Sequence, residues 1–103
     1  VYVKIQLLPE ELPQFIPLAK AFGIQGLSVT MPLKEAIISY LDEIDKNVKP
    51  IGSINTLRFK DGKITGTNTD GEGALDAIEK QIPVLGKKVV ILGAGGTARS
   101  IGF

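Results

Sequence analysis

The fold is decided by residues 64–73, which read Ile-Thr-Gly-Thr-Asn-Thr-Asp-Gly-Glu-Gly. The stretch begins with the pattern of a strand, becomes polar, and leads directly into a helix. Thr69 and Glu72 have the T-x-x-E spacing of a capping box, which predicts Thr69 as the N-cap and Asp70 in the first turn. Taken alone, an acidic first turn favours only a helix-dipole role for Asp70. We expect the helix to bury one apolar face, formed by Leu75, Ile78 and Ile82.

A β-hairpin is predicted immediately before this helix. Predicted strands over residues 53–59 and 63–68 flank the pair Asp61–Gly62, which is the strongest short-range hairpin signal. A two-residue turn pairs Lys60 with Lys63, Phe59 with Ile64, Leu57 with Gly66, and Asn55 with Asn68. Alternation then places Asn55, Asn68 and Asp70 on one face. This polar end of an apolar wall is either the floor of a small polar-ligand site or a solvated hairpin end.

The N-terminal half has the pattern of an α/β unit. Alternation predicts a strand over residues 2–7, apolar spacing predicts a helix over 9–22, and a second strand follows over 27–30. Strand, helix and strand at this length predict a parallel right-handed crossover. A further helix is expected from Leu33, and residues 45–50 are expected to form a loop. The buried stripe of the helix that begins at Leu33 would contain Leu33, Ala36, Ile37, Tyr40, Leu41 and Ile44.

The C-terminal end resembles the start of a nucleotide-binding domain. Residues 87–92 form an apolar run typical of a buried parallel strand, and Gly-Ala-Gly-Gly-Thr-Ala follows at 93–98. A glycine turn between a strand and a helix (97–103) favours a dinucleotide phosphate site, and the alternative is a glycine-rich turn without a ligand. The chain is therefore predicted to be α/β and reads as a fragment. It would comprise a substrate-binding domain (1–70), a connecting helix and linker (71–85), and the first β-α of a doubly wound Rossmann-type domain (86–103).

Composition excludes several kinds of chemistry. The 103 residues contain no cysteine and no histidine, which excludes thiolate nucleophiles, cysteine-ligated zinc and the commonest general base. Catalysis must therefore use Lys, Asp, Glu, Tyr, Ser or Thr, and no metal site is expected. The net charge of +1 gives no basic field for nucleic acid, and no apolar run has the length of a membrane span. We expect a cytoplasmic protein without nucleic-acid or membrane partners.

Lys34 breaks a local rule. It follows Pro32 in the first turn of a predicted helix, where a cation opposes the helix dipole. Violations of local rules often mark functional sites. The alternative is a solvated lysine that is tolerated at small cost.

Four segments together resemble a known family. Residues 26–34 (Gly-Leu-Ser-Val-Thr-Met-Pro-Leu-Lys), 52–57 (Gly-Ser-Ile-Asn-Thr-Leu), 66–71 (Gly-Thr-Asn-Thr-Asp-Gly) and 93–97 (Gly-Ala-Gly-Gly-Thr) are similar to the successive signatures of shikimate dehydrogenases, in order and spacing. Residues 1–7 are similar to forms in which a dehydroquinate dehydratase is fused upstream. Ser53 and Thr97 stand where alanine is usual or common in that family.

The resemblance implies reversible, NADP-dependent reduction of 3-dehydroshikimate to shikimate, in aromatic amino-acid biosynthesis. Lys34 and Asp70 match the catalytic pair, and Thr30 and Asn55 match substrate-contacting positions. The cofactor loop would comprise Gly93, Ala94, Gly95, Gly96 and Thr97. Relaxed specificity for quinate, use of NAD, and a non-catalytic dinucleotide-binding regulatory module remain alternatives. We expect the 103-residue chain alone to be inactive.

Overall fold

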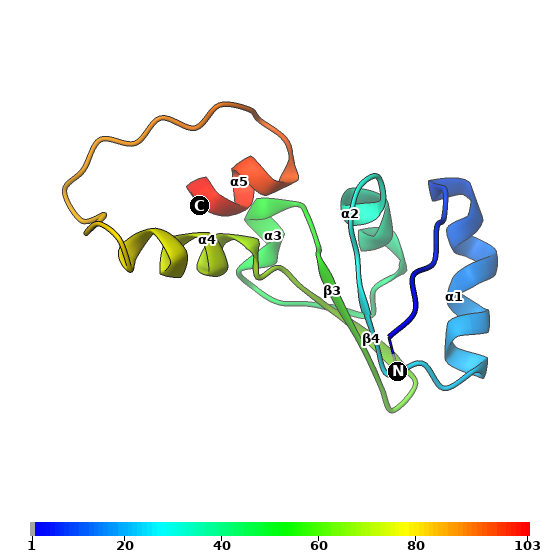
Figure 1. The fold of residues 1–103 in the computed structure, drawn as a ribbon. Helices are drawn as coiled ribbons and strands as arrows, with labels where there is room; N and C mark the ends of the chain where they lie inside the picture. The colour runs from blue at the N-terminus through cyan, green and yellow to red at the C-terminus, as the bar shows by residue number, and fades with distance from the viewer. Residues whose placement is uncertain (1) are drawn as a thin grey trace.

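A small four-stranded sheet forms the centre of the molecule. The structure is a computed structural model that describes residues 2–103, and its sheet has the strand order β1-β3-β4-β2 (Figure 1). The strands are β1 (Gly26–Ser28), β2 (Glu43–Ile44), β3 (Thr56–Lys60) and β4 (Lys63–Thr67). β3 pairs antiparallel with both β1 and β4, whereas β2 pairs parallel with β4. The predicted α/β class is confirmed.

The hairpin β3–β4 forms in the predicted register. Lys60 lies opposite Lys63, Phe59 opposite Ile64, and Leu57 opposite Gly66. Asp61 and Gly62 have φ angles of 51° and 76°, the positive values that a type I′ turn requires at both central residues. The local turn chemistry therefore fixes the pairing that carries Asn55 and Asp70 to the same end of the sheet.

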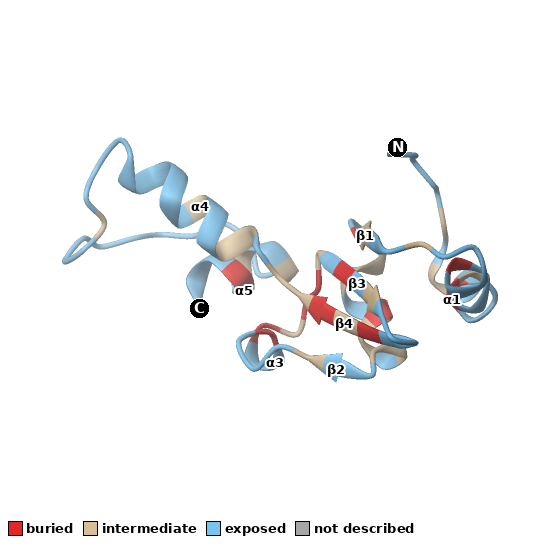
Figure 2. Ribbon diagram, turned by 90° about the horizontal axis from the view of Figure 1, so that it is seen from below, coloured by how far each residue is buried: buried red, intermediate tan, exposed pale blue. Residues whose placement is uncertain are grey.

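The hydrophobic core lies on β3 and β4. Leu57 and Ile64 are each 1% exposed, and the buried parts of these strands are visible in Figure 2. Gly66 allows this packing, because a Cβ there would overlap the side chains of Ile54 and Leu41. The remaining buried members of the cluster come from helices and connections: Leu12, Ile16, Val29, Ile37, Val48 and Ile54.

The helices of the N-terminal half are shorter than their sequence patterns predict. The 9–22 pattern forms a 3-10 turn η1 (Pro9–Glu11) and helix α1 (Leu12–Ala21). The helix predicted from Leu33 divides into α2 (Leu33–Ala36) and η2 (Ile37–Tyr40). Hydrogen bonds from Asp42 N to Ile64 O (3.0 Å) and Asp45 N to Gly66 O (3.3 Å) draw the following residues into β2. Placing Ile44 in the helical stripe was therefore wrong, and the expected loop 45–50 contains the start of α3 (Val48–Ile51).

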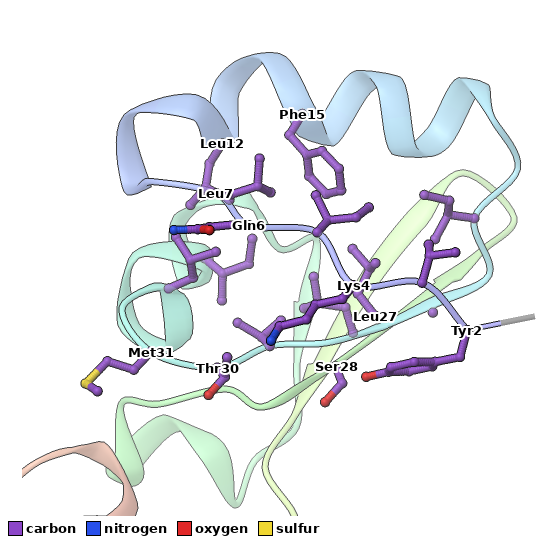
Figure 3. Close-up of a pocket in the computed structure, with 18 of the residues that line it drawn as sticks. Tyr2, Lys4, Gln6, Leu7, Leu12, Phe15, Leu27, Ser28, Thr30 and Met31 are labelled. Carbon is purple, nitrogen blue, oxygen red and sulfur yellow. The ribbon is translucent and has the colours of Figure 1, made fainter.

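The predicted strand over residues 2–7 is wrong. This segment belongs to no helix or strand, because a strand exists only where a neighbour supplies ladder hydrogen bonds. A cavity of about 770 Å³ separates it from β1, and both segments line the cavity (Figure 3). The predicted parallel crossover is consequently absent, and β1 pairs antiparallel with β3 instead.

The C-terminal part consists of two helices joined by a long loop. Helix α4 spans Asp70–Glu79 and helix α5 spans Gly96–Gly102, while the residues between them arc away from both (Figure 1). The prediction that α4 buries an apolar face is wrong, since Leu75, Ile78 and Ile82 are 43–58% exposed. The strand predicted over 87–92 is also not formed, because no strand of residues 2–103 pairs with it. Within residues 2–103, no helix is long and apolar enough to cross a membrane.

We predict that Leu57→Ala lowers the free energy of unfolding by about 2–5 kcal/mol, because it removes a fully buried side chain and leaves a cavity. Urea denaturation of the natural protein that carries this chain measures the change. Leu18→Ala is the matched control, because Leu18 of α1 is 53% exposed and should lose less than about 1 kcal/mol. Equal losses in the two variants would contradict the assignment of the core.

Candidate active site

Asp70 lies where β4 gives way to α4. Thr69 is the N-cap, as predicted, but no side-chain cap hydrogen bond forms, so the predicted capping box is wrong. The Thr69 hydroxyl instead accepts a hydrogen bond from Asn55 Nδ2 at 3.0 Å. Asn68 Oδ1 accepts the Asp70 N–H at 2.9 Å. Two asparagines therefore replace the capping box in holding the first turn of α4.

Lys34 and Asp70 form an ion pair. Lys34 Nζ donates to Asp70 Oδ2 at 2.5 Å, and the two side chains are 19% and 23% exposed. Lys34 belongs to α2, and its carbonyl oxygen accepts the Ile54 N–H at 2.8 Å. The residues are 36 positions apart in sequence, so the pair exists because the sheet brings the two helix starts together.

Asn55 holds the other oxygen of the Asp70 carboxylate. Its Nδ2 donates to Asp70 Oδ1 at 2.8 Å, which confirms that the two side chains share one face. Its Oδ1 accepts hydrogen bonds from Thr69 N at 3.1 Å and from Thr56 Oγ1 at 2.8 Å. The amide is thus engaged at both ends, and the carboxylate is oriented from two directions.

The pKa of Asp70 lies below its ordinary value. Partial burial raises this pKa, but the hydrogen bonds from Lys34 and Asn55 and the positive charge of Lys34 outweigh it. Asp70 is therefore a carboxylate at neutral pH.

The first turn of α5 reaches this pair. Thr97 Oγ1 lies 3.5 Å from Lys34 Nζ and accepts a hydrogen bond from it. Gly96 packs against Ser53, so closely that a Cβ on Gly96 would overlap the Ser53 hydroxyl. Two residues that the resemblance implied for the cofactor loop, Gly96 and Thr97, therefore contact Ser53 and Lys34 of the N-terminal half.

The preceding glycine turn presents open backbone. Gly93 and Gly95 are exposed, and Gly93 has a φ of 124° that side chains rarely allow. A Cβ on Gly95 would meet nothing within 4 Å. This open, Cβ-free surface fits the close approach of a pyrophosphate, so the residues present are compatible with a dinucleotide at Gly93, Ala94 and Gly95.

Thr30 lies in the connection between β1 and α2. Its carbonyl oxygen accepts the Leu33 N–H at 2.9 Å, and its exposed side chain lines the cavity between residues 2–8 and β1 (Figure 3). The cavity is a feature that sequence patterns did not predict. Within residues 2–103, no group of three carboxylates or other metal-ligating side chains is placed to hold a metal ion.

Sequence reasoning also missed the contribution of α5. Ser100 Oγ donates to Asn68 Oδ1 at 2.8 Å, and Arg99 donates to Glu35 Oε1 at 2.5 Å. These partners are 32 and 64 positions apart, and neither pair leaves a signal in the local pattern.

A half-buried ammonium held by a carboxylate can give a proton to a carbonyl oxygen and take it back. Beside an open glycine turn on an α/β scaffold, this arrangement is typical of dinucleotide-dependent oxidoreductases. Comparison with known proteins narrows the class. Residues 1–57 match the family described as the shikimate dehydrogenase substrate binding domain, and the chain belongs to the shikimate dehydrogenase family.

Individual relatives agree with this assignment. The chain is 52% identical to shikimate dehydrogenase (NADP(+)) of Methanocaldococcus jannaschii, over all of this chain and 37% of that protein. It is 48% identical to the shikimate biosynthesis protein AroDE of Chlamydia muridarum, over 97% of this chain and 21% of that protein. A crystal structure of shikimate dehydrogenase in complex with NADP⁺ superposes with a TM-score of 0.95 at 51% identity, covering 99% of this chain and 36% of that one. The chain thus spans about a third of the length of the shikimate dehydrogenases it matches.

We predict that Asp70→Asn lowers the free energy of unfolding by about 1–3 kcal/mol at neutral pH, because Lys34 loses its charged partner. The folded-state pKa of Asp70 is lowered, so its contribution is complete above the unfolded carboxyl pKa of about 4 and is lost as pH falls through the folded value. The difference between wild type and Asp70→Asn should therefore shrink on acidification.

Denaturation of the natural protein at a series of pH values measures this difference. Asp76→Asn is the matched control, because it removes an exposed carboxylate from the same helix. A wild-type advantage that stays constant down to strongly acidic pH would contradict the ion pair.

Proposed function

We propose that the protein containing this chain is an NADP-dependent shikimate dehydrogenase that reversibly reduces 3-dehydroshikimate to shikimate. One observation supports this most strongly. The Lys34 ammonium contacts Asp70 on the substrate-side lobe and Thr97 on the helix that follows the glycine turn. A proton donor therefore lies between the proposed substrate and nucleotide sites. Family membership and the name of the Methanocaldococcus jannaschii relative support the substrate and the choice of NADP.

When bound, NADP would supply or accept the hydride. The backbone of Gly93, Ala94 and Gly95 would hold its phosphates, since this turn is exposed and free of side-chain bulk. In this proposal residues 1–70 form the substrate-binding domain, residues 71–85 form the connecting helix and linker, and residues 86–103 begin the nucleotide-binding domain. A fusion to dehydroquinate dehydratase stays a prediction.

Lys34 would donate its proton to the ketone oxygen as the alcohol forms, and would accept it in the reverse direction. Asp70 would keep the ammonium oriented through the 2.5 Å contact and accept a hydrogen bond from an adjacent substrate hydroxyl. Asn55 would set the carboxylate plane through its 2.8 Å bond, and Thr30 would contact the ring from the start of α2. Holding the substrate ketone close to the Lys34 ammonium in this way would lower the entropic cost of proton transfer.

The deciding measurement is shikimate-dependent reduction of NADP⁺ by the natural protein, with quinate and NAD⁺ assayed in parallel. We expect turnover with shikimate and NADP⁺, and none from the 103-residue chain alone. A folded protein that binds NADP⁺ without turning over any of these hydroxy acids would refute the proposal and favour a regulatory dinucleotide-binding module.

We predict that Lys34→Met lowers kcat by about 10²–10⁴-fold with a much smaller change in KM, because it removes the proton donor and keeps the side-chain volume. Steady-state kinetics with shikimate measures both constants. Lys46→Met is the matched control, since it removes an exposed lysine of the same lobe and should retain wild-type turnover. Near-normal kcat in Lys34→Met would exclude the catalytic role.

A further inference from the structure

A chain of hydrogen bonds connects α5 with Asp70. The Ser100 hydroxyl donates to Asn68 Oδ1 at 2.8 Å, and the same oxygen accepts the Asp70 N–H at 2.9 Å. Asn68 Nδ2 donates to the Ser53 carbonyl oxygen at 2.8 Å. Asn68 thus joins three segments: α5, the start of α4, and the connection before β3. Ser100 is only 5% exposed, so water competes little for its hydroxyl.

The same helix also contacts Glu35, the sequence neighbour of Lys34. Arg99 donates to Glu35 Oε1 at 2.5 Å and to the Gly52 carbonyl oxygen at 3.5 Å, and Glu35 directly follows Lys34. The Glu35 and Arg99 side chains are 62% and 43% exposed. The Arg99–Glu35 ion pair is therefore screened by solvent and contributes little to stability. The buried Ser100–Asn68 link is therefore the stronger of the two connections.

We propose that Ser100 and Asn68 are positioning residues that set the geometry of the Lys34–Asp70 pair from the helix behind the glycine turn. This deepens the proposed function and rests on it. Neither residue has to touch the substrate. Ser100 holds Asn68, Asn68 holds the backbone of Asp70, and Asp70 holds Lys34. The position of α5, and with it of Gly93–Gly95, is thereby linked to the position of the proton donor.

Removing the Ser100 hydroxyl tests the Ser100–Asn68 hydrogen bond separately from the packing of α5. The close contact between α4 and α5 runs through the Ser100 carbonyl, which a Cβ on Gly71 would overlap. Alanine keeps that backbone and its Cβ, so Ser100→Ala deletes the hydrogen bond and little packing. Asn68 Oδ1 then keeps only the Asp70 N–H, so the amide is held by two hydrogen bonds in place of three.

The experiment compares the natural protein with Ser100→Ala, Asn68→Ala and the double variant in steady-state kinetics. We expect Ser100→Ala to lower kcat roughly three- to tenfold, the range of one lost hydrogen bond, with KM for both substrates within about twofold. The double variant should match Asn68→Ala alone, because both residues act through one link. Ser39→Ala is the matched control, since Ser39 Oγ makes an exposed hydrogen bond to the Ala36 carbonyl, and it should retain wild-type kinetics.

A second readout does not depend on turnover. A looser ion pair raises the pKa of Asp70 toward its ordinary value, which ¹³C NMR titration of the Asp70 carboxyl carbon in the natural protein detects. In residues 2–103, Lys34 is the charged side chain in ion-pair contact with Asp70, and Asn55 and Thr69 are its neutral neighbours. The acid limb of the kcat profile should move to higher pH in the same direction.

Three results would overturn the positioning role. One is an unchanged Asp70 pKa in Ser100→Ala, another is additive losses in the double variant, and the third is a raised KM for NADP⁺ with unchanged kcat, which indicates a cofactor contact. If the wild-type protein does not turn over shikimate, the proposed function fails, and the NMR titration alone decides the Ser100–Asn68 link.

Discussion

The Lys34–Asp70 ion pair is the interaction on which the candidate site depends. A lysine in the first turn of a helix faces an unfavourable dipole, and Lys34 is accommodated because a carboxylate lies 2.5 Å from its ammonium. The Asp70 carboxylate reaches Lys34 only if the β3–β4 hairpin has the register that places Asp70 on the same face as Asn55. A slip of one position would turn Asp70 and Asn55 to opposite faces. The register of the β3–β4 turn therefore determines whether Lys34 meets a carboxylate.

Polar side chains near the pair are satisfied by one another, with one exception. Asn55 and Asn68 use both ends of their amides, which suits groups removed from water. The Ser53 hydroxyl is fully buried and has no hydrogen-bond partner in residues 2–103. It lies against Gly96, as the Ser100 carbonyl lies against Gly71. Small residues thus bring α5 into contact with Ser53 and with the start of α4, and specific hydrogen bonds then set its position.

Three of the wrong sequence predictions share one physical cause. Residues 2–7 and 87–92 have the alternation or apolar run of strands, yet neither is paired within residues 2–103. An alternating or apolar pattern shows that a segment is suited to a strand. The strand forms only when a neighbouring strand supplies the ladder hydrogen bonds. The same reason explains why Leu75, Ile78 and Ile82 stay exposed on α4. The capping box failed differently, because Asn55, distant in sequence, took the Thr69 hydroxyl.

Local and compositional features followed directly from the amino-acid sequence. Asp61–Gly62 set the hairpin register, Thr69 marked the start of α4, and the absence of histidine and cysteine from these 103 residues left Lys, Asp, Glu, Tyr, Ser and Thr as candidate catalytic residues. Tertiary packing determined which distant groups meet: Lys34 with Asp70 and Thr97, and Ser100 with Asn68. These contacts join residues 32–63 positions apart, and their energy depends on distances that arise when the sheet and helices pack.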